Sequence, residues 1–454
     1  MSASVGISAV RKFPWWWIPG IVLLGTGFVF ISQDVPAVNV FWYVFAWYGY
    51  LLIIDAIIYY NQGHSFLSHR KIELGEMLLW SVPFWFLFEA YNFVLKNWYY
   101  VFALHSDWQQ GIFAWVSFAT VLPACFFHAE LLKSFGLFTK MKTTPVRVSK
   151  GLSQFFLYFG ALCIILPVIW PGATFWMVWG SILGIPDYIN YRNGAPSFLG
   201  DLEQGEPGRL YRLLGGGMIA GLVWEGFNYW ARCKWIYTVP GLEEWKIFEM
   251  PVMGFLGFPV LAVGAFATYT LLSRYLRGGR TWERADSEQL NKERSRWYWP
   301  VLGIAMGLSV VVYLGLLDIT LQSRRPVFGE YTQLTAGEIA GLNRAGVVTP
   351  EQLFHEIRAN GSQAIAQESG IPTSAADSLQ RFTSLVLHKG MGVHQARLLT
   401  SAGINSVTDL IGRKADSLYQ SLQEQAEFHD FGPPRLAEVH VWIRAAELAG
   451  GTKR

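Results

Sequence analysis

Two stretches of this sequence match each other: FEAYNF at residues 88–93 and WEGFNY at residues 224–229, an offset of 136. Each stretch places a glutamate and, three residues later, an asparagine inside a long apolar segment. A second pair of motifs, DAIIYYN at 55–61 and DYINYRN at 187–193, recurs at an offset of 132. The conserved order of the polar residues predicts two tandem copies of one structural unit.

The composition of the chain is that of a membrane protein. Apolar residues make up 52% of the 454 residues and charged residues only 15%, well below the quarter typical of soluble proteins. The 21 Trp and 32 Phe residues suit a protein with many helix ends at the level of the lipid headgroups. A net charge of +3 is too small to indicate a nucleic-acid partner. Membrane lipid is therefore the expected surrounding.

The apolar segments predict about nine spans, since a bilayer crossing needs about 20 apolar residues. They lie at 14–32, 38–60, 77–97, 110–131, 152–170, 173–191, 212–231, 247–273 and 297–321. The first four and the next four form the two copies. Because four is even, both copies enter from the same side, as in parallel-repeat transporters. The predicted fold is all-α: a polytopic transmembrane helical bundle with a small soluble helical C-terminal domain.

The expected domains are four. Residues 1–150 form membrane repeat 1, 151–275 membrane repeat 2, 276–329 a basic linker with the ninth span, and 330–454 the soluble domain. Nineteen Lys and Arg residues fall in segments on the same side of the membrane as the N-terminus, and four fall in the loops on the opposite side. This bias predicts an inner-membrane protein with a cytoplasmic N-terminus. Nine spans would place the C-terminal domain outside, and one miscounted span would reverse that.

The two glutamates are the leading ligand-binding candidates. Glu89 and Glu225 lie well inside predicted spans, where an ionisable group costs at least ~2.5 kcal/mol and normally faces the bundle interior or a polar cavity. Asn92 and Asn228 follow on the same helix faces. Each pair can present a carboxyl and an amide to a common site. Hydrogen bonding between helices is the alternative role for the same residues.

Further carboxyls extend this candidate set. Asp55 with Tyr59, and Asp187 with Tyr191, form i, i+4 pairs near the predicted cytoplasmic ends of their spans. Glu249 begins the eighth predicted span and has an apolar counterpart in the first copy. Such an unmatched group could mark where the two copies diverged into one asymmetric site. Structural pairing between helices is again the alternative.

The C-terminal domain has its own duplication. LNRAGVVTPEQL at 342–353 matches LTSAGINSVTDL at 399–410, an offset of 57, and each copy predicts a helix, a glycine turn and a capped helix. With the Gly-x-Gly of residues 390–392, this resembles the helix-hairpin-helix superfamily, in the tandem form of an uncharacterised bacterial domain family. The resemblance implies a phosphate site at Gly390, Gly392 and Val393, because hairpin amides and helix starts hold phosphates.

A nucleic-acid partner is nevertheless not expected. After residue 321 the chain has 13 Lys and Arg residues against 13 Asp and Glu residues, so the positive charge that drives backbone binding is missing. A protein partner or a structural role is expected for the C-terminal domain instead, and a homo-oligomer is left open. No metal-ligand spacing or cofactor fingerprint is present, so no metal and no cofactor is predicted.

Three functions fit these patterns. The first is a transporter or channel-like protein that binds protons, cations or a small polar solute between the repeats. The second is a membrane-embedded enzyme in which protonated carboxyls and aromatic faces act on a lipid or isoprenoid. The third is a membrane assembly factor or scaffold with a docking domain at its C-terminus. Transport is ranked first on the sequence.

Overall fold

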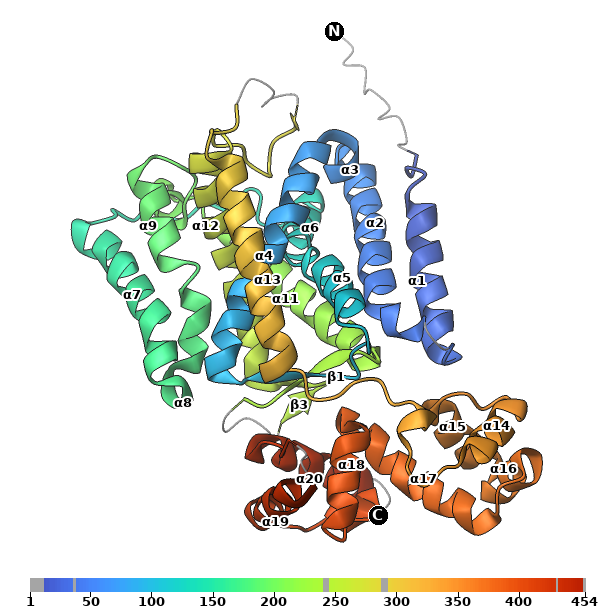
Figure 1. Cartoon of the computed structure of the whole chain (residues 1–454). Coiled ribbons are helices and arrows are strands. Elements are labelled where there is room, and N and C mark those ends of the chain that lie inside the picture. Colours follow the sequence, from blue (N-terminus) through green and yellow to red (C-terminus); the bar gives the residue numbers. More distant parts are fainter. Residues whose placement is uncertain (1–11, 36–37, 240–244, 287–292, 430–431, 452–454) are drawn as a thin grey trace.

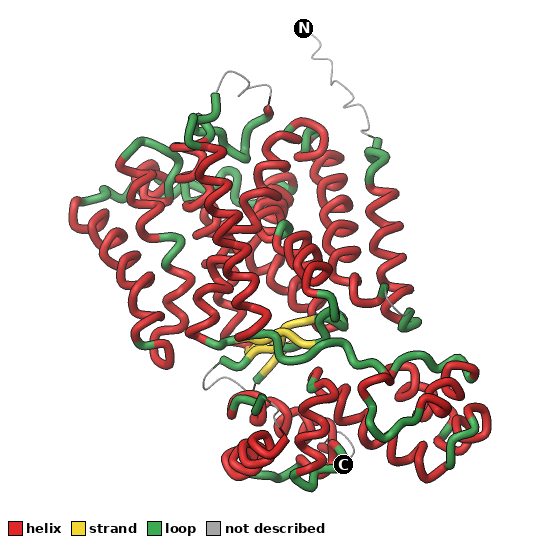
Figure 2. Tube along the Cα trace, viewed as in Figure 1, coloured by secondary structure: helices red, strands yellow, loops and turns green. Residues whose placement is uncertain are grey.

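The computed structural model describes residues 12–35, 38–239, 245–286, 293–429 and 432–451. Its helices form a bundle that ends at residue 319 and a C-terminal domain that begins at residue 336. Figure 1 shows the first helix beginning at one end of the bundle and the C-terminal domain lying against the other end. Short strands lie between the bundle and this domain (Figure 2).

The first half of the bundle contains α1 (Trp17–Ser32), α2 (Trp42–Gln62), α3 (Phe66–His69), α4 (Lys71–Leu95), β1 (Trp98–Val101), α5 (Asp107–Phe118) and α6 (Val121–Ser134). The second contains α7 (Lys150–Ile169), α8 (Pro171–Thr174), α9 (Gly184–Arg192), α10 (Phe198–Gln204), α11 (Gly208–Trp230), β2 (Lys234–Tyr237), β3 (Lys246–Ile247), β4 (Met250–Pro251) and α12 (Gly257–Leu276). The repeated motifs fall on equivalent elements: α2–α3 corresponds to α9–α10, and α4–β1 corresponds to α11–β2.

Six helical segments of the described chain are long and apolar enough to cross a membrane. They are 39–62, 71–95, 107–134, 150–169, 252–276 and 298–319, the last of which holds α13 (Tyr298–Ile319). Of the other expected spans, α1 has only 16 residues, α11 carries two arginines near its start, and the segment at 173–191 is broken by the 3₁₀ turn Phe175–Gly180. The span expected at 247–273 begins later, because β3 and β4 occupy residues 246–251.

An antiparallel ladder between β1 and β2 joins the two halves at one end of the bundle. Trp98 pairs with Tyr237, and Tyr100 pairs with Trp235. Exchanging the two copies turns one of these pairs into the other, so the ladder has approximate twofold symmetry about its centre. The sequence analysis did not predict these strands.

The two faces of the ladder have different neighbours, because successive side chains of a strand point to opposite sides. Trp98, Tyr100, Trp235 and Tyr237 share the face that lines cavities within the bundle. On the other face, Tyr99, Val101 and Ile236 form a buried cluster with a valine of the C-terminal domain. The ladder therefore separates the interior of the bundle from that domain.

The C-terminal domain has its own buried apolar core. It consists of α14 (Ala336–Arg344), α15 (Pro350–Asn360), α16 (Ser362–Ser369), α17 (Thr373–Leu387), α18 (Gly392–Ser401), α19 (Ala415–His429) and α20 (Leu436–Gly451). Thr335 and Glu338 cap α14 reciprocally, and Thr349 and Gln352 cap α15 in the same way. The cap of α15 lies where the Ser/Thr pattern predicted a helix start. In the second copy, Ser406 and Asp409 form the equivalent reciprocal cap on the 3₁₀ turn Val407–Leu410.

An ion-pair cluster ties the C-terminal domain to the bundle. Glu249, in the turn between β3 and β4, accepts from Lys234 and from Lys389 at 2.9 Å each. Burial alone would raise the pKa of Glu249, but the two ammonium groups outweigh burial and lower the pKa to about 2. The pairing with Lys389 thus links β2, this turn and the C-terminal domain through one carboxylate.

Reversing the charge of Lys389 should loosen the docked domain. In Lys389→Glu, two carboxylates would face each other, and we expect faster tryptic cleavage of the segment that joins α13 to α14. The second change Glu249→Lys should restore part of the protection, since it re-forms an opposite-charge pair. An unchanged cleavage rate in Lys389→Glu would contradict this role of the ion pair.

The same pairing predicts a pH dependence of docking. Because the pKa of Glu249 is lowered in the folded protein, its contribution is complete above the ordinary value of 4.5 and is lost as the pH falls toward about 2. Hydrogen exchange of α20 should therefore show the same protection factors at pH 5 and pH 8. Protection that already falls between pH 8 and pH 5 would contradict this assignment.

Candidate functional site

Glu89 lies on α4 and is fully buried. Its carboxyl accepts hydrogen bonds from Tyr100 Oη at 2.6 Å and Trp85 Nε1 at 2.9 Å, and a longer one from Trp98 Nε1 at 3.3 Å. Three donors converge on this carboxyl, and none of them carries a charge. Such a set favours the ionised form, because a carboxylate can only accept hydrogen bonds.

Glu225 occupies the equivalent place on α11 and is also fully buried. Its Oε1 accepts from Tyr237 Oη at 2.8 Å, the counterpart of the Tyr100 bond in the first copy. Its Oε2 is buried without a hydrogen-bond partner among the described residues. A carboxyl with one donor and one bare oxygen is better suited to being protonated than Glu89 is.

One substitution between the copies accounts for part of this difference. Trp85, four residues before Glu89, corresponds to Gly221, four residues before Glu225. A Cβ at Gly221 would lie 2.2 Å from Phe258, so this ring of α12 packs where the second copy lacks a side chain. The second carboxyl therefore has no equivalent of the Trp85 donor.

The side chains of the two asparagines hydrogen-bond to the backbone at the strands. Asn92 donates to the carbonyl of Trp98 at 2.9 Å and accepts from the amide of Asn97, also at 2.9 Å. Asn228 donates to the carbonyl of Trp235 at 3.0 Å and accepts from its amide at 3.1 Å. The glutamate and the asparagine of each predicted pair therefore have different structural roles. The glutamates face the aromatic side chains, and the asparagines hold the strands that carry those side chains.

Two small cavities lie beside the ladder on its inner side. One has a volume of about 50 Å³ and the other about 30 Å³, and both are bordered by Trp85, Tyr100, Trp224 and Trp235. Trp85 and Trp224 pack against each other with ring centroids 5.3 Å apart and ring planes tilted by 37°. The site is thus a closed, aromatic chamber beside two carboxyl–phenol pairs, and a ligand larger than a water molecule or two requires these rings to move apart.

The aspartates do not pair with the tyrosines as expected. Asp55 accepts from Ser65 Oγ at 2.7 Å and from the amide of Phe66 at 2.9 Å, and Asp187 accepts from the amide of Phe198 at 2.7 Å. These carboxylates anchor the starts of α3 and α10, where unpaired helix amides attract negative charge. Tyr191 instead donates to Glu203 on the surface. Tyr59 packs edge-on against Trp16.

The remaining candidates are not among the residues that line the chamber. Glu249 is held by its two lysines, and the residue next to it, Met250, lines the chamber. The hairpin of the C-terminal domain faces the bundle: Ser323 Oγ donates to the carbonyl of Gly390 at 2.6 Å, and a Cβ at Gly390 would lie 2.5 Å from Val101. Gly392 similarly lies against Ser323, and Val393 is buried. The predicted phosphate site is therefore covered by the protein's own strand end.

Sequence reasoning missed the aromatic partners of the carboxyls. Trp98 and Tyr100 follow Glu89 as a Trp-x-Tyr motif, and Trp235 and Tyr237 follow Glu225 in the same way. The offset between these motifs is 137, one residue more than for the glutamates, so one insertion hides the match. Aligning the copies beyond the asparagines would have found it. Among the described residues, no three His, Cys, Asp or Glu side chains are grouped to hold a metal ion.

Comparison with known proteins identifies one part of the chain. Residues 332–448 match the model of a domain of unknown function, DUF4332. This match covers the helical C-terminal domain and leaves the bundle unassigned. No curated protein and no solved structure matches the chain. The function of the bundle must therefore be argued from its own residues.

Removing Asn92 should destabilise the bundle by detaching β1. Asn92→Ala leaves buried strand amides and a carbonyl without partners, and we expect the free energy of unfolding to fall by about 3 kcal/mol. Thermal unfolding in detergent, followed by tryptophan fluorescence, measures this change. Asn193→Ala is the matched control, because Asn193 is exposed and should change stability by less than about 0.5 kcal/mol. Equal effects of the two substitutions would refute the strand-holding role.

Proposed function

We propose that the bundle is a membrane-embedded enzyme that performs acid–base chemistry on an apolar, unsaturated lipid of the isoprenoid type. One observation carries the proposal: Tyr100 and Tyr237, which donate hydrogen bonds to the buried carboxyls of Glu89 and Glu225, line one aromatic chamber. Glu89 accepts more hydrogen bonds than Glu225, so Glu89 is suited to be the base and Glu225 to be the acid. Positioned groups of this kind can transfer protons to and from a reacting carbon.

The proposed reaction balances without a redox step. Glu225, as the acid, gives its proton to one carbon of a double bond, and the π electron pair forms the new C–H bond. The adjacent carbon becomes a cation. Glu89, as the base, then takes a proton from a neighbouring carbon, and the released electron pair forms a new double bond. The product is an isomer of the substrate, and the cycle is completed when Glu89 releases its proton to solvent and Glu225 takes a proton from solvent.

The aromatic lining suits the cationic intermediate. Faces of Trp and Tyr rings attract positive charge, and the attraction grows where water is excluded. The smaller cavity is bordered by Trp85, Trp179, Trp224 and Trp235, and none of the described residues that line it is a lysine or an arginine. Lys234 lines the larger cavity. A closed apolar chamber also protects a carbocation from capture by water.

A membrane location supports the same proposal. Large apolar side chains are exposed along α13, among them Ile304, Leu308 and Val311, at the spacing of one helix face. A contiguous apolar surface of this kind is unfavourable in water and matches hydrocarbon. We propose a cytoplasmic N-terminus and a non-cytoplasmic C-terminal domain. We further propose that this domain is of the tandem helix-hairpin-helix type and that its hairpin docks on its own bundle.

Solvent deuterium tests the chemistry without knowledge of the substrate. Purified protein is reconstituted with total lipid from its expression host in D₂O, and the lipids are analysed by mass spectrometry. Wild type should place deuterium on carbon in a particular lipid, because the acid equilibrates with solvent. Glu225→Gln and Glu89→Gln should abolish this incorporation. The surface variant Glu203→Gln should retain it, and incorporation that persists in both buried variants would exclude the mechanism.

Transport of protons or small cations is the second candidate. The bare Oε2 of Glu225 favours it, because a buried oxygen without a partner can receive a proton or a cation. The closed ladder next to this carboxyl disfavours it, since a pathway would have to open the pairing between β1 and β2. Proteoliposomes that contain a pH-sensitive dye decide the question. Proton flux that Glu225→Gln abolishes, without deuterium on lipid carbon, would replace the enzyme proposal with transport.

A further inference from the structure

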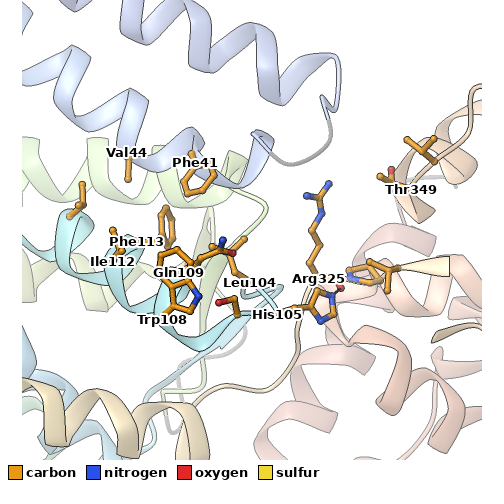
Figure 3. A pocket seen from close by; sticks show the side chains of 15 residues that line it. Phe41, Val44, Leu104, His105, Trp108, Gln109, Ile112, Phe113, Arg325 and Thr349 are labelled. Atoms are coloured by element: carbon orange, nitrogen blue, oxygen red, sulfur yellow. Dashed lines mark hydrogen bonds between the residues drawn. The ribbon is translucent and has the colours of Figure 1, made fainter. Parts of the chain in front are cut away.

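A large groove lies at the end of the bundle, beside the C-terminal domain (Figure 3). Its volume is about 810 Å³, far larger than the inner cavities. One wall comes from α2 and α5, and the other comes from residues 325–327 and the start of α15. A space of this size can hold a hydrocarbon chain together with a polar headgroup.

The bundle side of the groove is apolar. Val44, Ile112, Phe113 and Val116 lie along it, and Trp108 stands near its mouth (Figure 3). Ile112 is 56% exposed and Trp108 is 67% exposed. Tryptophan prefers the level of the lipid headgroups, and isoleucine prefers the hydrocarbon below it. This wall is therefore suited to an aliphatic chain that reaches inward from the membrane interface.

The opposite end of the groove carries an available cation. Arg325 is fixed by its backbone, whose amide donates to the carbonyl of Ala103 at 2.8 Å, and by His105 Nε2, which lies 2.8 Å from the Arg325 carbonyl. Figure 3 shows the Arg325 side chain reaching into the space between Phe41 and Thr349. Its Nη2 is buried and has no hydrogen-bond partner among the described residues. An unpartnered guanidinium nitrogen favours an anionic oxygen as its ligand.

Neighbouring charges do not satisfy this guanidinium. The adjacent Arg324 is already paired with Asp107 at 2.6 Å, and the nearby Asp34 is paired with Arg232 at 3.1 Å. Burial raises the pKa of Glu351, and the positive charge of the nearby Arg325 opposes that rise. Glu351 is buried, however, and does not line the groove. Among the described residues that line the groove, Arg325 and His105 are basic and none is acidic.

Phe113 connects the groove with the interior. It lines the groove and also the 50 Å³ cavity, and that cavity shares Trp85, Tyr100, Trp224 and Trp235 with the chamber between the two carboxyls. The ring of Phe113 is buried, so it closes the boundary between the two spaces. The three cavities therefore follow one another from the bundle surface to the ladder.

We propose that the groove binds a single-chain amphiphile with a phosphate or other anionic headgroup. Arg325 holds the headgroup, and the chain lies along α5 with its end toward Phe113. The further step, in which the chain passes Phe113 and reaches the carboxyls, rests on the proposed function. Headgroup binding does not rest on it. The groove then selects the substrate class by charge at one end and by apolar contact along its length.

Binding is tested on purified full-length protein in a neutral detergent with three probes: dodecyl phosphate, dodecanol and inorganic phosphate. Dodecyl phosphate should bind more tightly than either of the others, because only this probe offers both the anion and the chain. Arg325→Gln should weaken its binding about tenfold, the loss expected for a charge-assisted hydrogen bond. The exposed Arg344→Gln is the matched control. Equal binding of dodecyl phosphate to Arg325→Gln and wild type would overturn the proposal.

A bare phosphate site or a purely apolar site would also be recognised. Inorganic phosphate that binds as tightly as dodecyl phosphate would show an ion site without a chain, and dodecanol that binds equally would show an apolar site without a headgroup contact. Either result overturns the amphiphile proposal. Binding without any deuterium incorporation in wild type would refute the enzyme proposal and leave the groove intact.

Discussion

Two carboxyl groups buried in an apolar bundle need hydrogen-bond donors, and the architecture of this protein supplies them from one short ladder. The strands β1 and β2 bring Tyr100 to Glu89 and Tyr237 to Glu225. The asparagines three residues beyond the glutamates hold the same strands by their backbone. In each repeated motif, the glutamate thus needs a hydrogen-bond donor, and the asparagine holds the strand that carries this donor. Because the strands pair with each other, satisfying either carboxyl also joins the two halves.

The ladder also explains the place of the C-terminal domain. A two-stranded ladder with an apolar outer face would be exposed at the end of the bundle, and the C-terminal domain covers it with Val441. The segment that follows α13 pairs with the free edge of β1, since Tyr100 exchanges hydrogen bonds with Thr320 and Gln322. This pairing delivers Ser323 to the hairpin of the domain and Arg325 to the groove. One edge therefore positions both a docking contact of the C-terminal domain and the arginine proposed to bind the headgroup.

Periodicity and repetition revealed the helices and the matching polar motifs, but not the strands. Most helices follow from long apolar runs, and Glu89 and Glu225 stand out because charges are rare in such runs. The four-residue strands fall in the loops after the motifs, where no alternating pattern is long enough to be recognised. The aspartates misled because spacing suggested tyrosine partners on the same helix, whereas a serine hydroxyl ten residues later and helix amides eleven and twelve residues later bind them. Glu249 has no counterpart in the first copy, and its partner Lys389 lies 140 residues away in the sequence.

Duplication alone would produce two carboxyls with the same surroundings, and nothing would then fix which of them acts as the acid and which as the base. The difference between Trp85 and Gly221 breaks that equivalence at the residue four positions before each glutamate. The first copy keeps an indole donor that stabilises a carboxylate, while the second gives the space to Phe258 and leaves an oxygen bare. The groove adds a second asymmetry, since it approaches the chamber from the side of α5 in the first half. In the proposed reaction, a ligand that arrives by that route approaches two carboxyls that repetition made alike and local packing made different, and this difference decides which of them gives a proton and which takes one.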